Sequence, residues 1–211
     1  MAAKRLAVLV VPILVLVSIA GAQDFKYFGE VNELSVTAGR AFVSTQTVQT
    51  THLPLHFGSP ASFAFNYSRL LKSRRIIGLR AELPIAIDPR MKLNYYDDVI
   101  PKDIGTLFIT PALHVNLFPN DSVTPWVSAG GGYGHFWQSS NLVWGGKNTG
   151  PTGTTTGVVQ FGGGLDVWFW HRWGARLEVR DFYSGVPDLN VDTGRSRQHN
   201  YYVGIGVVHR F

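Results

Sequence analysis

The chain lacks cysteine altogether and carries few charged residues. The absence of cysteine from 211 residues excludes a disulfide framework, a thiolate metal site and a lipoprotein anchor. Charged residues make up 16% of the chain, against roughly 25% in soluble domains. The net charge of +5 is too small to indicate a nucleic-acid partner. Glycine, with 23 residues, and aromatic residues, at 13%, are abundant instead, which suits one β domain with an apolar exterior.

Long apolar runs are also missing, except at residues 6–19, which follow Lys4 and Arg5. The small residues 20–22, Ala-Gly-Ala, come directly after that run and match a signal-peptidase cleavage site. Residues 1–22 are therefore predicted to be a secretory signal peptide. An uncleaved membrane anchor is the alternative, but fourteen residues are few against the ~20 that a spanning helix needs.

The rest of the chain alternates between apolar residues and small or polar residues, which is the pattern of β-strands with one apolar face. The pattern is clearest at the C-terminus, HNYYVGIGVVHRF, where one face carries Tyr201, Val203, Ile205, Val207, His209 and Phe211. Eight strands are predicted, at 33–43, 60–70, 76–87, 104–118, 124–137, 157–170, 174–184 and 199–211.

The connections between these strands alternate in length. The short ones are 71–75, 119–123 and 171–173, and the long ones are 44–59, 88–103, 138–156 and 185–198. Short turns at one end and long loops at the other are typical of membrane barrels, in which about 10 tilted residues cross the ~25 Å apolar band. The sequence therefore predicts an all-β fold: a closed eight-stranded antiparallel up-and-down transmembrane β-barrel over 32–211, preceded by a short segment at 23–31.

Aromatic residues gather near both ends of the predicted strands, where the side chains of a barrel meet the water–lipid boundary. The residues expected to form two aromatic girdles are Phe118, Tyr133, Trp137, Phe169, Trp170, Trp173, Tyr183, Tyr201 and Phe211.

A few residues depart from the barrel pattern. Arg40 falls on an apolar face, so we expect either a bulge or a place near the rim. Pro125 can begin a strand. Pro84 and Pro111 fall inside strands, where they predict local bulges or displaced strand boundaries.

Three stretches of the sequence resemble a known family. Residues 124–134, TPWVSAGGGYG, are similar to the fifth strand of the OmpA-like and opacity-type barrels of bacterial outer membranes. Residues 162–182, GGGLDVWFWHRWGARLEVRDF, are similar to the sixth and seventh strands of those barrels. The terminal strand, which ends on Phe211, resembles the signal that their assembly machinery reads.

The resemblance implies a monomer in the bacterial outer membrane, in contact with lipids including lipopolysaccharide, with residues 23–31 on the periplasmic side. It also implies that the barrel-assembly machinery binds the terminal strand, and that the peptidoglycan-binding domain of some relatives is missing. The expected role is structural, adhesive or weakly solute-passing, without catalysis, a cofactor or a nucleic-acid partner.

Charged residues on the polar faces of the strands predict an ionic network inside the barrel. Its expected members are Arg80, Glu82, His114, Asp166, Arg176, Glu178 and Arg180. An eight-stranded barrel is just wide enough for side chains to fill, so arginine and glutamate of opposite strands can meet. We interpret the network as a structural plug, because unpaired charge is costly where water is scarce. A gate for small ions, or a proton or metal path, are the alternatives.

A lipid A-modifying enzyme is the main alternative of another class. A deacylase needs histidine, serine and a carboxylate together on the lipid-facing rim. His135 lies near Ser139 and Ser140 in the sequence, but no carboxylate is placed to orient it. A soluble lipocalin-like barrel is a third alternative, which the charged lumen argues against.

The long loops contain no motif that indicates a metal or phosphate site. Asp97, Asp98 and Asp103 lack the spacing of a calcium loop, so we interpret them as solvated charge, like Asp188 and Asp192. The loop rich in glycine, threonine and asparagine lacks the Gly-Lys-Ser/Thr of a phosphate cradle.

The predicted network leads to a first test. Replacing Glu178 with alanine should destabilise the barrel, because a buried arginine would lose its counter-ion. A melting temperature equal to that of the unaltered protein would argue against the network.

Overall fold

The computed structural model describes residues 30–211, so the predicted signal peptide and most of segment 23–31 lie outside the described residues. The strands are β1 (Asn32–Val43), β2 (Gln46–Thr47), β3 (Pro54–Phe57), β4 (Ala61–Ser73), β5 (Ile77–Asn94), β6 (Asp103–Ile109), β7 (Ala112–Leu117), β8 (Val123–Gln138), β9 (Gly153–Trp168), β10 (Trp173–Gly185) and β11 (Arg197–Arg210). Within the described range, no helix is long and apolar enough to cross a membrane.

The strands form one antiparallel ring. β1 pairs with β4 on one side and with β11 on the other, so the sheet closes on itself. From β4 the ring runs through β5, β8, β9 and β10 to β11, with β6 and β7 sharing the place between β5 and β8. The described residues therefore occupy eight positions, and the predicted closed eight-stranded barrel is confirmed.

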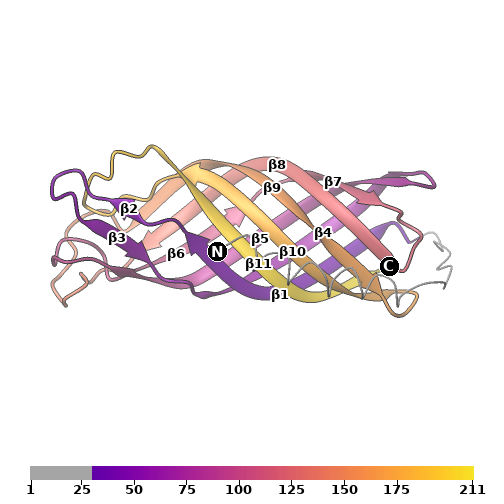
Figure 1. Ribbon diagram of the computed structural model, residues 1–211, viewed down its shortest axis with the longest axis horizontal. Helices are drawn as coiled ribbons and strands as arrows, with labels where there is room; N and C mark the ends of the chain where they lie inside the picture. Colours follow the sequence, from indigo (N-terminus) through magenta and orange to yellow (C-terminus); the bar gives the residue numbers. More distant parts are fainter. Residues whose placement is uncertain (1–29) are drawn as a thin grey trace, which may run out of the picture.

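The long loops and the short turns lie at opposite ends of the barrel. Figure 1 shows β2 and β3 with the long loops at one end, and the C-terminus with the short turns at the other. β2 and β3 form a small hairpin within the first long loop, and β3 also pairs with the far end of β5. Short turns are periplasmic in outer-membrane barrels, so this arrangement predicts that the long loops form the external end.

The alternation of the sequence places apolar side chains outside the barrel. In β4, Phe63, Phe65 and Tyr67 point outward and are 40–45% exposed. Ala64 and Asn66 lie between them in sequence, point inward and are 0–2% exposed. A closed ring pairs every strand edge, and its outer apolar face can then be covered by lipid tails.

Several strands are longer than the alternation predicted. β5 has 18 residues, and β8 and β9 have 16 each, whereas about 10 cross the apolar band. The additional residues lie at the long-loop end, in ranges such as 88–94 and 153–156 that were predicted as loop. Above the lipid the outer face meets water, so these parts need no apolar row and give no alternating signal.

Pro84 and Pro111 weaken the wall without shifting its register. β6 ends before Thr110 and β7 begins after Pro111, yet the register with β5 and with β8 is the same on both sides of the gap. Thr110 N–H donates to Pro84 O at 3.2 Å, and Gly131 N–H donates to Pro111 O at 3.1 Å. Proline has no N–H to return, so each pair keeps one bond of two. The bulges expected at these prolines are not there.

Register shifts occur elsewhere, between Leu70 and Lys72 and between Asp88 and Met91. Arg40 needs no bulge, because β1 keeps a continuous register with both neighbours. Its Nη1 donates to Ser59 O at 2.8 Å, just before β4 begins, which places Arg40 near the rim at the long-loop end.

One of the two missing ladder bonds can be restored by a single substitution. Pro111→Ala supplies an N–H that faces the Gly131 carbonyl, and one added backbone bond is expected to raise stability by about 1 kcal/mol. The midpoint of urea unfolding in detergent measures this gain. Pro151→Ala, in the loop before β9, is the control and should leave the midpoint unchanged. A lower midpoint for Pro111→Ala would contradict the account of the gap.

Candidate functional site: the closed lumen

The charged residues of the inward faces meet in the half of the lumen nearer the short turns. Arg80 and Glu82 come from β5, His114 from β7, Asp166 from β9, and Arg176, Glu178 and Arg180 from β10; all of them are buried. Two residues that the sequence reasoning missed join them, Glu33 of β1 and Arg210 of β11.

Arg176 and Asp166 form the best-aligned pair. They are register partners on β10 and β9, and two parallel bonds of 2.7 Å join the guanidinium to the carboxylate. Such two-point pairing is the strongest geometry available to arginine. Arg176 also donates to Ser35 Oγ at 3.0 Å, which ties this pair to β1.

Arg180 links the two sides of the barrel. Its Nη2 lies 2.8 Å from Glu82 Oε1 on β5, and its Nε lies 2.9 Å from Glu178 Oε2. Glu178 also accepts a hydrogen bond from the Thr37 hydroxyl. The carboxylates on both sides of Arg180 are therefore held in place by several strands.

Glu33 joins three arginines into one cluster. It lies 2.8 Å from Arg210, 3.2 Å from Arg80 and 3.6 Å from Arg176. Asn66, which donates to Ser35 Oγ at 3.1 Å and to Glu178 at 3.4 Å, links this cluster to that of Arg180. Within residues 30–211, the network joins four guanidinium groups to four carboxylates, so its charges balance. Removing one partner of a buried pair leaves the other uncompensated and costs roughly 3–5 kcal/mol.

Trp126 fills the space beside the ions. Its ring lies 5.1 Å from the guanidinium carbons of both Arg176 and Arg180, and the His114 ring stacks on it at 4.7 Å. His114 also lies 3.4 Å from Glu82. The sequence reasoning missed Trp126, although it lies two positions before Ser128 and therefore on the same inward face of β8.

A second layer, made of aromatic rings, closes the lumen toward the long loops. The rings of Phe108 and Phe182 stack at 4.6 Å, and the Phe136 ring meets Phe108 edge-on at 5.8 Å. All three side chains are almost fully buried. These residues, which we call the aromatic layer, were missed because their neighbours on the inward faces are small or polar.

The long loops are hydrogen-bonded to one another above this layer. Asp98 accepts bonds from Trp144 N at 2.7 Å and Gly146 N at 3.2 Å, which ties the second long loop to the third. Asn148 and Asn190 join the third to the fourth at 2.9 Å. Asp98, interpreted above as solvated charge, thus organises a loop contact. In the described part of the chain, no group of three metal-ligating side chains could hold a metal ion.

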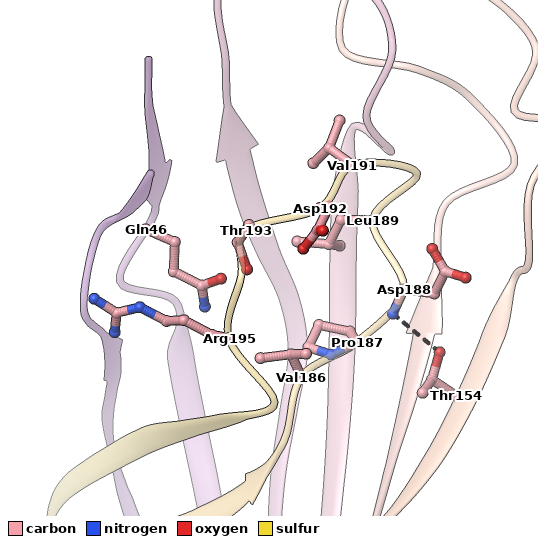
Figure 2. A pocket seen from close by; sticks show the side chains of 10 residues that line it. All are labelled: Gln46, Thr154, Val186, Pro187, Asp188, Leu189, Val191, Asp192, Thr193 and Arg195. Carbon is pink, nitrogen blue, oxygen red and sulfur yellow. Dashed lines mark hydrogen bonds between the residues drawn. The ribbon is translucent and has the colours of Figure 1, made fainter. Parts of the chain in front are cut away.

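A hollow of about 260 Å³ lies in the fourth long loop, between that loop and Gln46 and Thr154 (Figure 2). Its polar lining includes Asp188, Asp192 and Arg195. Each of the two carboxylates accepts a hydrogen bond from the backbone N–H two residues further on. These carboxylates stabilise turns of the loop, so the polar groups do not converge on a ligand.

The residues predicted for the girdles lie on the outside of the barrel. Two pairs of rings mark the two levels on β10 and β11: Trp173 packs on His209 at 4.3 Å, and Tyr183 packs on His199 at 4.7 Å. Ten positions along β10 separate the pairs, which corresponds to the ~25 Å apolar band. The spacing supports the assignment of these levels to the water–lipid boundaries.

The two histidines of the external rim differ in their partners. His135 Nδ1 is 2.8 Å from Thr155 Oγ1, whereas His199 Nδ1 is 2.7 Å from Asp181 Oδ2. The histidine–carboxylate pair that the sequence reasoning sought at His135 is therefore found at His199. Within residues 30–211, no serine hydroxyl is hydrogen-bonded to it.

The terminal strand closes the ring. Backbone bonds of 3.0 Å run both ways between Asn32 and Phe211. Its outward residues are those of the predicted assembly signal, whose recognition stays a prediction.

No protein-family model and no curated protein matches the sequence. Solved structures of outer-membrane proteins do match. Neisserial surface protein A is 15% identical, with a TM-score of 0.51 over 85% of this chain and 97% of that chain. OprG from Pseudomonas aeruginosa is 12% identical, with a TM-score of 0.50 over 86% and 97%. AlkL is 12% identical, with a TM-score of 0.54 over 90% and 94%. The chain therefore has the fold of the eight-stranded bacterial outer-membrane β-barrels.

Proposed function

We infer that the protein is a non-enzymatic structural barrel of the bacterial outer membrane that keeps its lumen closed and presents its joined loops outside. The observation that carries this inference is the double closure of the lumen. The ionic network fills one half, and the aromatic layer of Phe108, Phe136 and Phe182 fills the other.

The two layers oppose the passage of an ion in different ways. An ion that enters the network must separate paired charges such as Arg180 and Glu82, and the separated charges then stay buried with fewer partners. The same ion must then pass the packed rings of Phe108, Phe136 and Phe182, whose apolar faces do not replace its water shell. Rearrangement of ion pairs alone would not open a path. The barrel supports adhesion or envelope integrity better than solute passage.

The joined loops support a role at the cell surface. Hydrogen bonds between the long loops hold them in one arrangement, so a partner would meet a preformed surface. A preformed surface loses little conformational entropy on binding.

Conductance in a planar bilayer tests the closed lumen. The unaltered protein should give no single-channel currents. Phe108→Ala with Phe182→Ala should also be silent, because the ionic network still closes the barrel. Adding Arg180→Ala to these two should produce currents. Regular channel openings by the unaltered protein would overturn the proposal, and currents from the phenylalanine variant would show that the network alone does not seal.

The enzymatic alternative has a separate test. A His–carboxylate pair can activate a nucleophile, but the described residues place no serine hydroxyl on His199. Mass spectrometry of lipid A should therefore give the same acyl pattern in cells with and without the protein. A mass change that disappears in His199→Asn would identify a lipid-modifying enzyme and refute the non-enzymatic assignment.

A further inference from the structure

The hairpin between β4 and β5 differs from the other short turns by a register shift between Leu70 and Lys72, which lies at its base. Every residue from 71 to 77 is exposed. Its tip contains three cations, Lys72, Arg74 and Arg75. We refer to residues 71–77 as the basic hairpin. In Figure 1 it lies at the end of the barrel where the C-terminus lies, opposite the long loops.

The cations of the basic hairpin have no counter-ion within the described part of the chain. Among residues 30–211, no carboxylate pairs with Lys72, Arg74 or Arg75. The β9–β10 turn differs, since its Arg172 lies 3.3 Å from Glu30. Three adjacent positive groups without a negative neighbour repel one another, so the tip gains from an anionic ligand.

Apolar side chains lie directly beside these cations. Leu71, Ile76 and Ile77 are 49–56% exposed. The neighbouring turn adds Phe118, which is also exposed and whose N–H donates to Ile76 O at 2.8 Å. Apolar groups at this level favour contact with acyl chains over contact with water. The cations, at the tip, then lie at the level of the lipid headgroups.

We propose that the basic hairpin binds the phosphate groups of anionic phospholipids in the periplasmic leaflet. The apolar residues select a lipid over a wall polymer, because a polymer of sugars and peptides would leave Leu71 and Ile76 in water. Arginine suits phosphate, since its planar group donates two parallel bonds to two oxygens. The site anchors one side of the barrel at a fixed depth.

Lipid retention tests the proposal. The protein is reconstituted in vesicles of phosphatidylcholine with phosphatidylglycerol, and native mass spectrometry counts the lipids that remain bound after release. The unaltered protein should retain phosphatidylglycerol in excess of its share. In the variant Lys72→Gln/Arg74→Gln/Arg75→Gln the excess should fall, by roughly fivefold for each cation that contacts a phosphate. High salt should reduce the excess of the unaltered protein in the same direction.

Two variants control for charge and folding. Lys92→Gln/Lys102→Gln/Lys147→Gln removes three cations at the opposite end and should keep the excess. Arg74→Lys/Arg75→Lys keeps the charge and should retain most of it. A heat-dependent gel shift shows that the hairpin variant is folded. The proposal fails if this folded variant keeps the full excess of phosphatidylglycerol. It also fails if the Lys92/Lys102/Lys147 variant loses as much of the excess as the hairpin variant does. It also fails if purified peptidoglycan sediments the unaltered protein but not the hairpin variant, because the ligand is then the wall.

Discussion

The structure depends on the pairing of every backbone N–H and C=O where lipid, not water, surrounds the wall. An open sheet would leave two strand edges unpaired in hydrocarbon, so the first strand must meet the last. In this protein β1 and β11 pair without a register shift along their whole contact. Closure then decides where side chains go: one face of every strand meets lipid and the other meets a narrow interior. One weak place is the pair of prolines in neighbouring strands, Pro84 and Pro111, where the ladder loses two bonds.

The narrow interior imposes a second constraint, because it admits little water. Charges placed there must neutralise one another and fill space at the same time. The pairs around Arg176 and Arg180 meet both needs, with Trp126 packed against the two guanidinium groups. Glycines opposite the large rings make the packing possible: a Cβ on Gly164 would lie 2.6 Å from Trp126, and one on Gly134 would lie 2.7 Å from Phe108. Small and large inward residues are therefore complementary across strands.

The period of the sequence was enough to predict the closed ring, because lipid demands an apolar residue at every second position across the membrane. The same pattern did not predict where the strands end at the long loops. Strands such as β5 and β9 continue beyond the lipid, where no apolar row is required on the outer face. The seven charged lumen residues could be proposed from parity alone. Glu33 and Arg210 were missed because 177 positions separate them and only the closed ring brings them together. Phe108 and Trp126 were missed because parity identifies a shared face, but does not show which rings oppose glycines on another strand.

The contact between Glu33 and Arg210 has a consequence for how the barrel is completed. The two residues are register partners on the first and last strands, 2.8 Å apart. Until those strands meet, Glu33 lacks one cation and the interior holds an excess of negative charge. A slip of two positions would satisfy the alternation of faces but separate the pair. The pairing of these two charges therefore favours the native register of β1 and β11 over a register shifted by two positions.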